Sequence, residues 1–142
     1  MPTNRLDQPK AEKRSELVQA ACRLFLQDGF DRTSMSRIAS EAGVTPNTIY
    51  WYFKDKDDLL LAVNDQFVQE YMKVYLADMV DKPLSEQLVW LVNQLKPFNG
   101  LITTVHNRIH SSEAVHKWHA GFHALMERLL IMQLPGAQPT TH

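Results

Sequence analysis

Two short apolar segments that meet at Gly43 constrain the fold of this chain more than any other feature of its sequence. In the first segment, apolar residues recur at helical spacing after Thr33 and Ser34, either of which can cap a helix. Gly43 permits a sharp turn, because glycine reaches left-handed backbone angles without steric cost. Thr45 then suits an N-cap, and the proline after it suits the first position of a second helix at about 46–53. The pattern predicts a helix-turn-helix unit.

The rest of the chain is also predicted to be helical. No segment alternates apolar and polar residues as a strand does, and most of the five glycines and seven prolines fall between apolar-periodic segments. The expected helices cover about 10–28, 35–42, 46–53, 56–80, 83–96, 101–110 and 113–133. We therefore predict an all-α fold, with a three-helix head (10–56) joined by a long fourth helix to a helical second domain (57–134) and a loose tail (135–142).

The third helix, 46–53, has two distinct faces when its positions are sorted at about 100° per residue. The inner face holds Ile49, Tyr52 and Phe53. The outer face holds Asn47, Thr48 and Trp51. Asparagine can form paired hydrogen bonds with an adenine edge, and threonine can contact a thymine methyl group. The outer face therefore predicts base contacts in a DNA major groove. Two alternatives stay open: Trp51 folds back onto the head, and Tyr50, between the faces, either reaches a phosphate or supports the turn.

Residues in register across positions 13–60 resemble the head of the TetR family of transcriptional regulators. The matching residues are Lys13, Arg14, Ala20, Ala21, Leu24, Phe25, Gly29, Phe30, Thr33, Ile38, Ala39, Ala42, Gly43, Val44, Thr48, Ile49, Tyr50, Tyr52, Phe53, Lys56, Leu59 and Leu60. A match of this length is far more specific than a bare helix-turn-helix pattern. The resemblance implies a ligand-responsive repressor that binds a palindromic double-stranded DNA operator as a homodimer.

The resemblance also implies roles for individual residues of the motif, at about 34–53. Base-edge contacts would fall on Ser36, Pro46, Asn47, Thr48, Tyr50 and Trp51, next to the cap residue Thr45. Phosphate contacts would fall on Ser34, Arg37, Tyr52 and Lys56. Simpler alternatives exist for the two cations: Arg37 as a solvated surface residue, and Lys56 as either a solvated lysine or the partner of Asp57 or Asp58.

The second domain is where the resemblance implies ligand binding and dimerisation. Aromatic and methionine side chains available for a cavity are Trp90, Phe98, Trp118, Phe122, Met126 and Met132, with ordinary core packing as the alternative. The effector and any cofactor stay unidentified. Family members continue for two further helices beyond a loop that resembles the terminal PGAQPTTH, so we expect an incomplete domain. A shortened regulator that pairs with a full-length relative is therefore a second hypothesis.

Histidines are concentrated in one part of the second domain. His106 and His110 are four residues apart, while His116, His119 and His123 share a helix face. Imidazoles at such spacing can bind Zn²⁺, which makes a histidine-rich metal-responsive protein a further alternative. No paired cysteine motif or carboxylate cluster accompanies them, so we predict surface or interface histidines and no metal. The sequence also has no glycine-rich phosphate loop or nucleophile elbow, and we expect no enzymatic activity.

Charge and targeting signals agree with a cytoplasmic DNA-binding protein. Residues 1–56 hold nine Lys/Arg against seven Asp/Glu, a net of +2, whereas residues 57–142 hold six against nine, a net of −3. A basic front on an acidic body is the distribution expected of a head that faces DNA. The first ten residues contain no apolar secretory core, and no apolar run reaches the length of a membrane span. A single cysteine, Cys22, fits a reducing compartment.

Overall fold

The computed structural model describes residues 7–134, and every regular element in that range is helical. The α-helices are α1 (Asp7–Asp28), α2 (Met35–Glu41), α3 (Pro46–Tyr52), α4 (Lys56–Val74), α5 (Leu84–Leu95), α6 (Asn99–Arg108) and α7 (Glu113–Met132). A π-helical turn, Tyr75–Met79, continues α4, and a 3-10 turn, Lys96–Phe98, joins α5 to α6. The all-α prediction is confirmed. The tail predicted at 135–142 lies outside the described residues.

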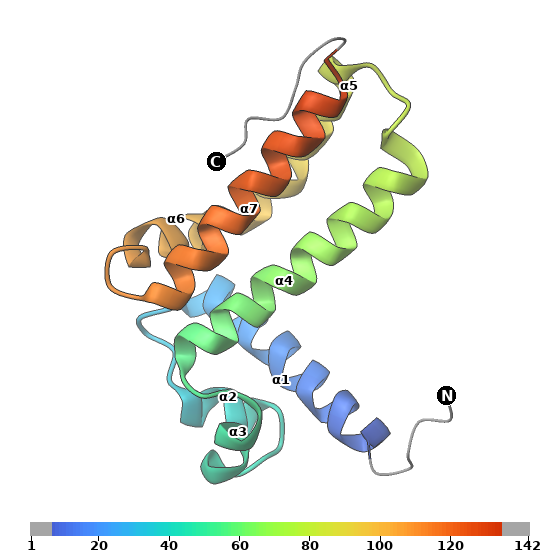
Figure 1. The fold of residues 1–142 in the computed structure, drawn as a ribbon. Helices are drawn as coiled ribbons and strands as arrows, with labels where there is room; N and C mark the ends of the chain where they lie inside the picture. The colour runs from blue at the N-terminus through green and yellow to red at the C-terminus, as the bar shows by residue number, and fades with distance from the viewer. Residues whose placement is uncertain (1–6, 135–142) are drawn as a thin grey trace.

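The long helix α4 runs from one end of the molecule to the other (Figure 1). The short helices α2 and α3 lie at one end, and α5 lies at the opposite end. Helix α7 packs alongside α4, and α1 packs against the first part of α4. No helix among residues 7–134 is long and apolar enough to cross a membrane.

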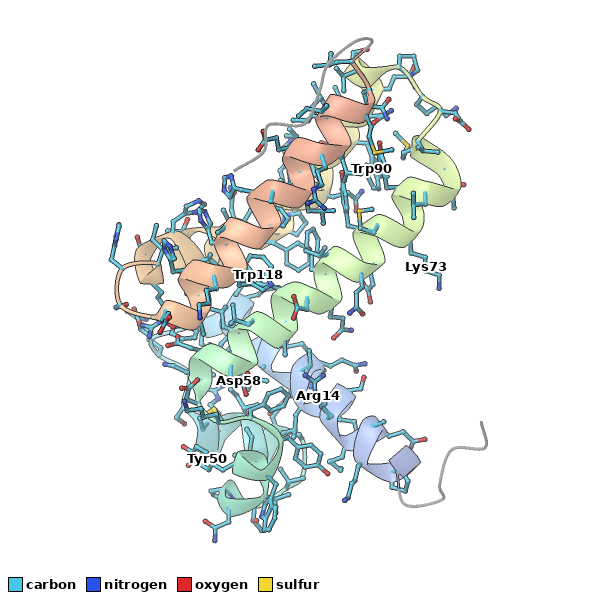
Figure 2. The ribbon with its side chains drawn as sticks, in the orientation of Figure 1. Arg14, Tyr50, Asp58, Lys73, Trp90 and Trp118 are labelled. Carbon is cyan, nitrogen blue, oxygen red and sulfur yellow. The ribbon has the colours of Figure 1, made fainter. Side chains whose placement is uncertain are left out.

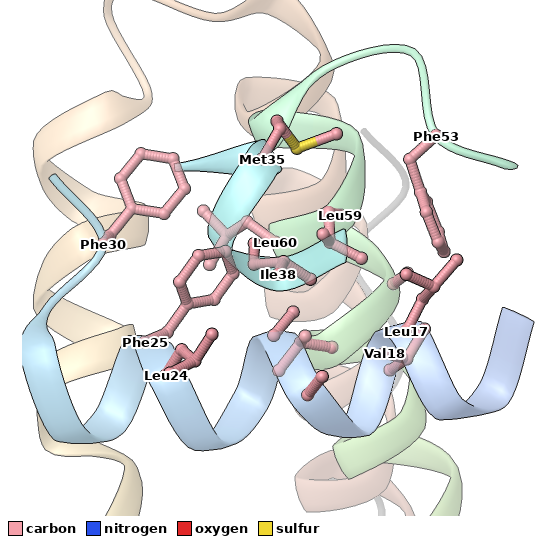
Figure 3. Packing of buried hydrophobic residues seen from close by; sticks show 14 of the residues in the cluster. Leu17, Val18, Leu24, Phe25, Phe30, Met35, Ile38, Phe53, Leu59 and Leu60 are labelled. Carbon is pink, nitrogen blue, oxygen red and sulfur yellow. The ribbon is translucent and has the colours of Figure 1, made fainter. Parts of the chain in front are cut away.

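The buried core begins where α1 meets the first two turns of α4. Figure 3 shows this seam, which α2 and the residue after α3 close from the other side. Fully buried side chains here include Leu17, Ile38, Ile49, Leu59 and Leu60. The same cluster continues to Leu101, Val105 and Val115 in α6 and α7. The hydrophobic core is thus continuous across residue 56, where the sequence predicts a domain boundary. The division into a head and a second domain stays a prediction about the functions of the two parts.

Local signals in the sequence explain how the first two helices are joined. Gly29 ends α1 with a φ of 91°, and its N–H donates to the carbonyl of Phe25 at 3.0 Å. Of the two candidate caps for α2, the structure uses Ser34, whose hydroxyl accepts from the N–H of Arg37 at 3.1 Å. Thr33 is buried instead, and its hydroxyl donates to the carbonyl of Gly29 at 2.7 Å. The loop is therefore fixed from within.

Two helix boundaries in the second half differ from the sequence prediction. The break expected at Pro97 and Gly100 is shorter than predicted: α5 ends at Leu95, Pro97 occupies an early position of the 3-10 turn, where no N–H donor is needed, and Gly100 already lies in α6. The helix expected at 56–80 widens into the π-helical turn at Tyr75. The buried Tyr75 hydroxyl donates to Gln87 of α5 at 3.0 Å, which joins the two helices at this end of the molecule.

Shortening a core residue of α1 should destabilise the fold far more than shortening an exposed neighbour. Leu24 is 3% exposed and Leu26, on the same helix, is 41% exposed. We expect Leu24→Ala to lower the free energy of unfolding by about 2–5 kcal/mol, because it loses buried area and leaves a cavity. Leu26→Ala should change it by no more than about 0.5 kcal/mol. Urea unfolding followed by circular dichroism measures both, and equal effects would contradict this packing.

Candidate nucleic-acid interface

The turn between α2 and α3 is fixed by two backbone hydrogen bonds around Gly43. The N–H of Gly43 donates to the carbonyl of Ser40 at 3.1 Å, and the N–H of Val44 donates to the carbonyl of Ala39 at 2.9 Å. This pair of bonds is the Schellman arrangement, which needs a left-handed residue at the position of Gly43, whose φ is 73°. The sharp turn predicted from the sequence is confirmed, and it sets the angle between the two helices.

Helix α3 is held against the head by its cap and by two buried side chains. Thr45 is the N-cap, and its hydroxyl accepts from the N–H of Thr48 at 3.3 Å. Ile49 is fully buried, and Phe53, which follows the helix, is nearly so. The guanidinium of Arg14 lies 5.1 Å from the centre of the Phe53 ring. A helix of this length has little stability alone, so these contacts fix its orientation.

The opposite face of α3 is open to solvent. Trp51 is 87% exposed and Tyr50 is 56% exposed, so neither is folded back onto the head. Asn47 is also exposed, whereas Thr48 is half-buried and its hydroxyl lies 2.8 Å from that of Thr45. Figure 2 shows Tyr50 at the end of the molecule, away from α5 and α7. The structure therefore brings the predicted base-contacting residues of α3 onto one accessible surface.

The residues predicted to contact phosphates have different surroundings. Ser34 is exposed, as is Ser36, the predicted base-edge residue of α2, and Tyr52 is half-buried. Arg37 is exposed, with its Nη2 3.0 Å from Oδ2 of Asp28. The ammonium of Lys56 donates to the carbonyl of Phe30 at 2.8 Å and lies 4.3 Å from the centre of that ring. The ammonium of Lys56 thus binds neither Asp57 nor Asp58, the two partners considered from the sequence. It instead joins the start of α4 to the loop after α1.

Sequence reasoning missed two cations that lie beside the exposed face of α3. Lys10 and Arg14 of α1 line a shallow groove together with Thr48, Trp51 and Tyr52. Both cations are exposed, and they belong to a basic stretch of α1 whose spacing gave no indication that it would meet α3. The groove joins positive charge to polar and aromatic groups, a combination suited to a nucleic-acid backbone and base edges.

A second missed feature ties the head to α6. Arg108, the last residue of α6, donates to both carboxylate oxygens of Asp57, with 2.7 Å between Nη2 and Oδ2. Its guanidinium lies 5.1 Å from the ring of Phe30, the same ring that Lys56 contacts. The hydrogen bond with Asp57 raises the pKa of Arg108. We refer to Arg108, Asp57, Lys56 and Phe30 as the Arg108 clamp.

Behind the head, α4, α6 and α7 enclose an apolar pocket of about 130 Å³. Three of the six residues predicted for a cavity, Phe98, Trp118 and Phe122, line it. Of the others, Trp90 of α5 stacks on Tyr71 of α4, with 4.8 Å between ring centres. The pocket wall also contains the amide of Asn64, whose Nδ2 is buried and has no hydrogen-bond partner among the described residues. An apolar pocket with one unpaired donor is suited to a small, mostly apolar ligand that carries an acceptor.

Comparison with known proteins connects this geometry to transcriptional regulators. Residues 17–63 match the family described as bacterial regulatory proteins, tetR family. The HTH-type transcriptional regulator AcrR of Shigella flexneri is 40% identical over 81 residues, which cover 55% of this chain and 38% of that protein. The fatty acid metabolism regulator protein of Bacillus subtilis is 29% identical over 83 residues, with coverage of 58% and 43%.

A third relative matches a longer part of the chain than these two do. The probable HTH-type transcriptional regulator ArpR of Pseudomonas putida is 31% identical over 97 residues, which cover 68% of this chain and 46% of that protein. The matched part spans less than half the length of each of these three relatives. The similarity is therefore firmest for the head and for the helix that leaves it.

Removing the guanidinium of the Arg108 clamp should destabilise the fold. The side chains of Arg108 and Asp57 are half-buried, and Arg108→Ala leaves the carboxylate without its charged partner. We expect the free energy of unfolding to fall by about 1–3 kcal/mol. Arg128→Ala, at an exposed position of α7, is the matched control and should change it by no more than about 0.5 kcal/mol. Urea titration of both variants tests this, and an unchanged stability for Arg108→Ala would contradict the clamp.

Proposed function

We propose that the chain, whose residues 17–63 match the tetR family of bacterial regulatory proteins, is a ligand-responsive transcriptional repressor. The observation that carries the proposal is the exposed face of α3, where Trp51 is almost wholly accessible on a helix seated by buried residues. An exposed aromatic side chain on an otherwise polar helix suits a partner surface. A repressor that acts on bacterial DNA works in the cytoplasm.

The recognition helix of the proposed complex is α3, which enters the major groove. Asn47, Thr48 and Trp51 contact base edges, with Tyr50 and Pro46 beside them. Ser36 reaches the same groove from α2. Support comes from their shared exposure at one end of the molecule and from the rigid seat that the Thr45 cap and Ile49 provide. A rigid seat favours specific binding, because little conformational entropy is lost on contact.

Phosphate contacts in this proposal surround the recognition helix. Ser34, Arg37 and Tyr52 take the roles implied by the family, and Lys10 and Arg14 add two cations from α1. Lys56 gives one of its three ammonium protons to the carbonyl of Phe30, which leaves two for a phosphate oxygen. Such contacts fix orientation on the duplex without reading sequence.

A palindromic operator requires two recognition helices, and we propose that two copies of the protein supply them. In helix-turn-helix dimers the half-sites lie about 34–36 Å apart, one turn of DNA. The proposed effector site is the apolar pocket between α4, α6 and α7. The unpaired Nδ2 of Asn64 supports a ligand with a hydrogen-bond acceptor, because burying a donor without a partner costs about 1–3 kcal/mol.

Removing the outward side chains of α3 should abolish sequence preference. We expect Thr48→Ala/Trp51→Ala to lose about 1–3 kcal/mol of binding free energy for each base contact removed, measured on an operator selected from random duplexes. Fluorescence anisotropy at fixed salt gives the affinity, and circular dichroism checks the fold. Thr103→Ala, which removes an exposed hydroxyl on α6, is the control and should bind like the unmodified chain. If the double variant binds the selected operator as tightly as the unmodified chain does, the assignment of α3 as the recognition helix is refuted.

Neutralising cations beside α3 should weaken binding to all sequences alike. Each phosphate contact releases a counterion, so we expect Arg37→Ala and Lys10→Ala each to lower the slope of log affinity against log salt by about 0.9. Both residues are exposed, and the fold should tolerate the changes. Lys73→Ala, an exposed lysine on the distal part of α4, is the control and should leave the slope unchanged. An altered sequence preference with an unaltered slope would exclude a phosphate role.

A further inference from the structure

Three of the histidines converge where α6 meets α7. His106 lies on α6, and His119 and His123 lie four residues apart on α7. One ring nitrogen from each can be chosen so that all three lie within 4.8 Å of one another. His106 and His123 are exposed and His119 is half-buried, so the cluster is open to solvent on one side. Helical spacing alone pairs His119 with His123, and only the packing of α6 on α7 adds His106.

Hydrogen bonds prepare His106 to act as a ligand through one particular nitrogen. Its Nδ1 lies 2.8 Å from the carbonyl oxygen of Ile102, which can only accept, so Nδ1 carries the proton. In a neutral ring its Nε2 then carries a lone pair, which accepts from the Nε2–H of His119 at 3.2 Å. The lone pair becomes available to a metal when His119 takes the tautomer that is protonated at Nδ1. A ring N–H held by a backbone carbonyl is the usual support of a metal-binding histidine.

His119 packs against both of the other histidines of the cluster. Its ring centre lies 4.9 Å from that of His106. The rings of His119 and His123 lie 4.3 Å apart, centre to centre, so both imidazoles share the same small volume. Protonated imidazoles at this distance would repel one another, whereas a cation between neutral rings would satisfy their lone pairs.

We propose that His106, His119 and His123 bind one borderline divalent cation such as Zn²⁺, bridging α6 and α7. In a tetrahedral site with Zn–N bonds of about 2.0–2.1 Å, two ligand nitrogens lie about 3.3 Å apart. The 3.2 Å between His106 and His119 already matches this spacing. The wider separations within the cluster close by small rotations of exposed rings. Imidazole is a ligand that first-row metals of this class accept readily.

Three protein ligands leave a tetrahedral ion with one further position for water or an added ligand. All three histidines also line the apolar pocket, beside Phe122 and Trp118. The cation therefore lies at the edge of the proposed effector site. All three ligands belong to α6 and α7, so binding of the cation can be measured without DNA.

Titration of the tag-free chain with Co²⁺, without DNA, tests this site. Tetrahedral Co²⁺ gives visible absorption bands that octahedral aqueous Co²⁺ lacks, so we expect strong absorption that saturates at one equivalent and is abolished by Zn²⁺. His119→Ala and His106→Ala should each raise the Kd for Co²⁺ at least about tenfold. His110→Ala, which removes a histidine outside the cluster, is the matched control and should leave the Kd unchanged.

Two readouts separate a metal site from a structural role of the histidines. Circular dichroism shows whether each variant folds, and Zn²⁺ should raise the melting temperature of the unmodified chain and of His110→Ala but not of His119→Ala. Absorption without saturation at one equivalent, or equal loss in His110→Ala, would overturn the proposal. Neither result bears on DNA binding, so this site and the proposed repressor function fail or stand separately.

Discussion

Burial of the first two turns of α4 against α1 is the contact on which the rest of the structure depends. Leu59 and Leu60 are fully buried there, and the same cluster takes in Ile49 and Phe53 beside the recognition helix. Helix α3 is too short to persist without such support. Its orientation, and hence the direction of the exposed Trp51, follows from a hydrophobic core made mostly by other helices. Further along, α4 is also one wall of the pocket, so a single helix positions both candidate sites.

The Arg108 clamp places charge where this core reaches the surface. Arg108 ends α6, the helix that contributes Val105 and His106 to the pocket wall. Its carboxylate partner, Asp57, is the second residue of α4, next to Lys56 and the loop that α2 follows. The pocket and the head therefore share α6 and the start of α4 as common boundaries. A rearrangement of α6 would therefore act on Asp57 and also on α1 and Phe30, which α6 contacts directly.

The sequence predicted features that depend on near neighbours, such as the Gly43 turn, the Thr45 cap and the inner face with Ile49. These signals act within a few residues, and the backbone has few ways to satisfy them. It did not predict that Lys10 and Arg14 lie beside Trp51, or that Arg108 binds Asp57. Those contacts depend on how whole helices cross, which no local spacing encodes. The convergence of His106 with His119 was missed for the same reason, while the DNA-binding roles of individual residues stay predictions.

The three tryptophans of the chain occupy three distinct environments. Trp51 projects into solvent at the end of the head, and Trp90 stacks on Tyr71 near α5. Trp118 lies at the pocket, where its indole N–H donates to Asp65 at 2.6 Å. An indole in water emits at longer wavelength than one packed among apolar groups, and a soluble quencher reaches it first. The intrinsic fluorescence of the chain therefore separates Trp51 of the head from the half-buried Trp90 and Trp118, without any attached dye.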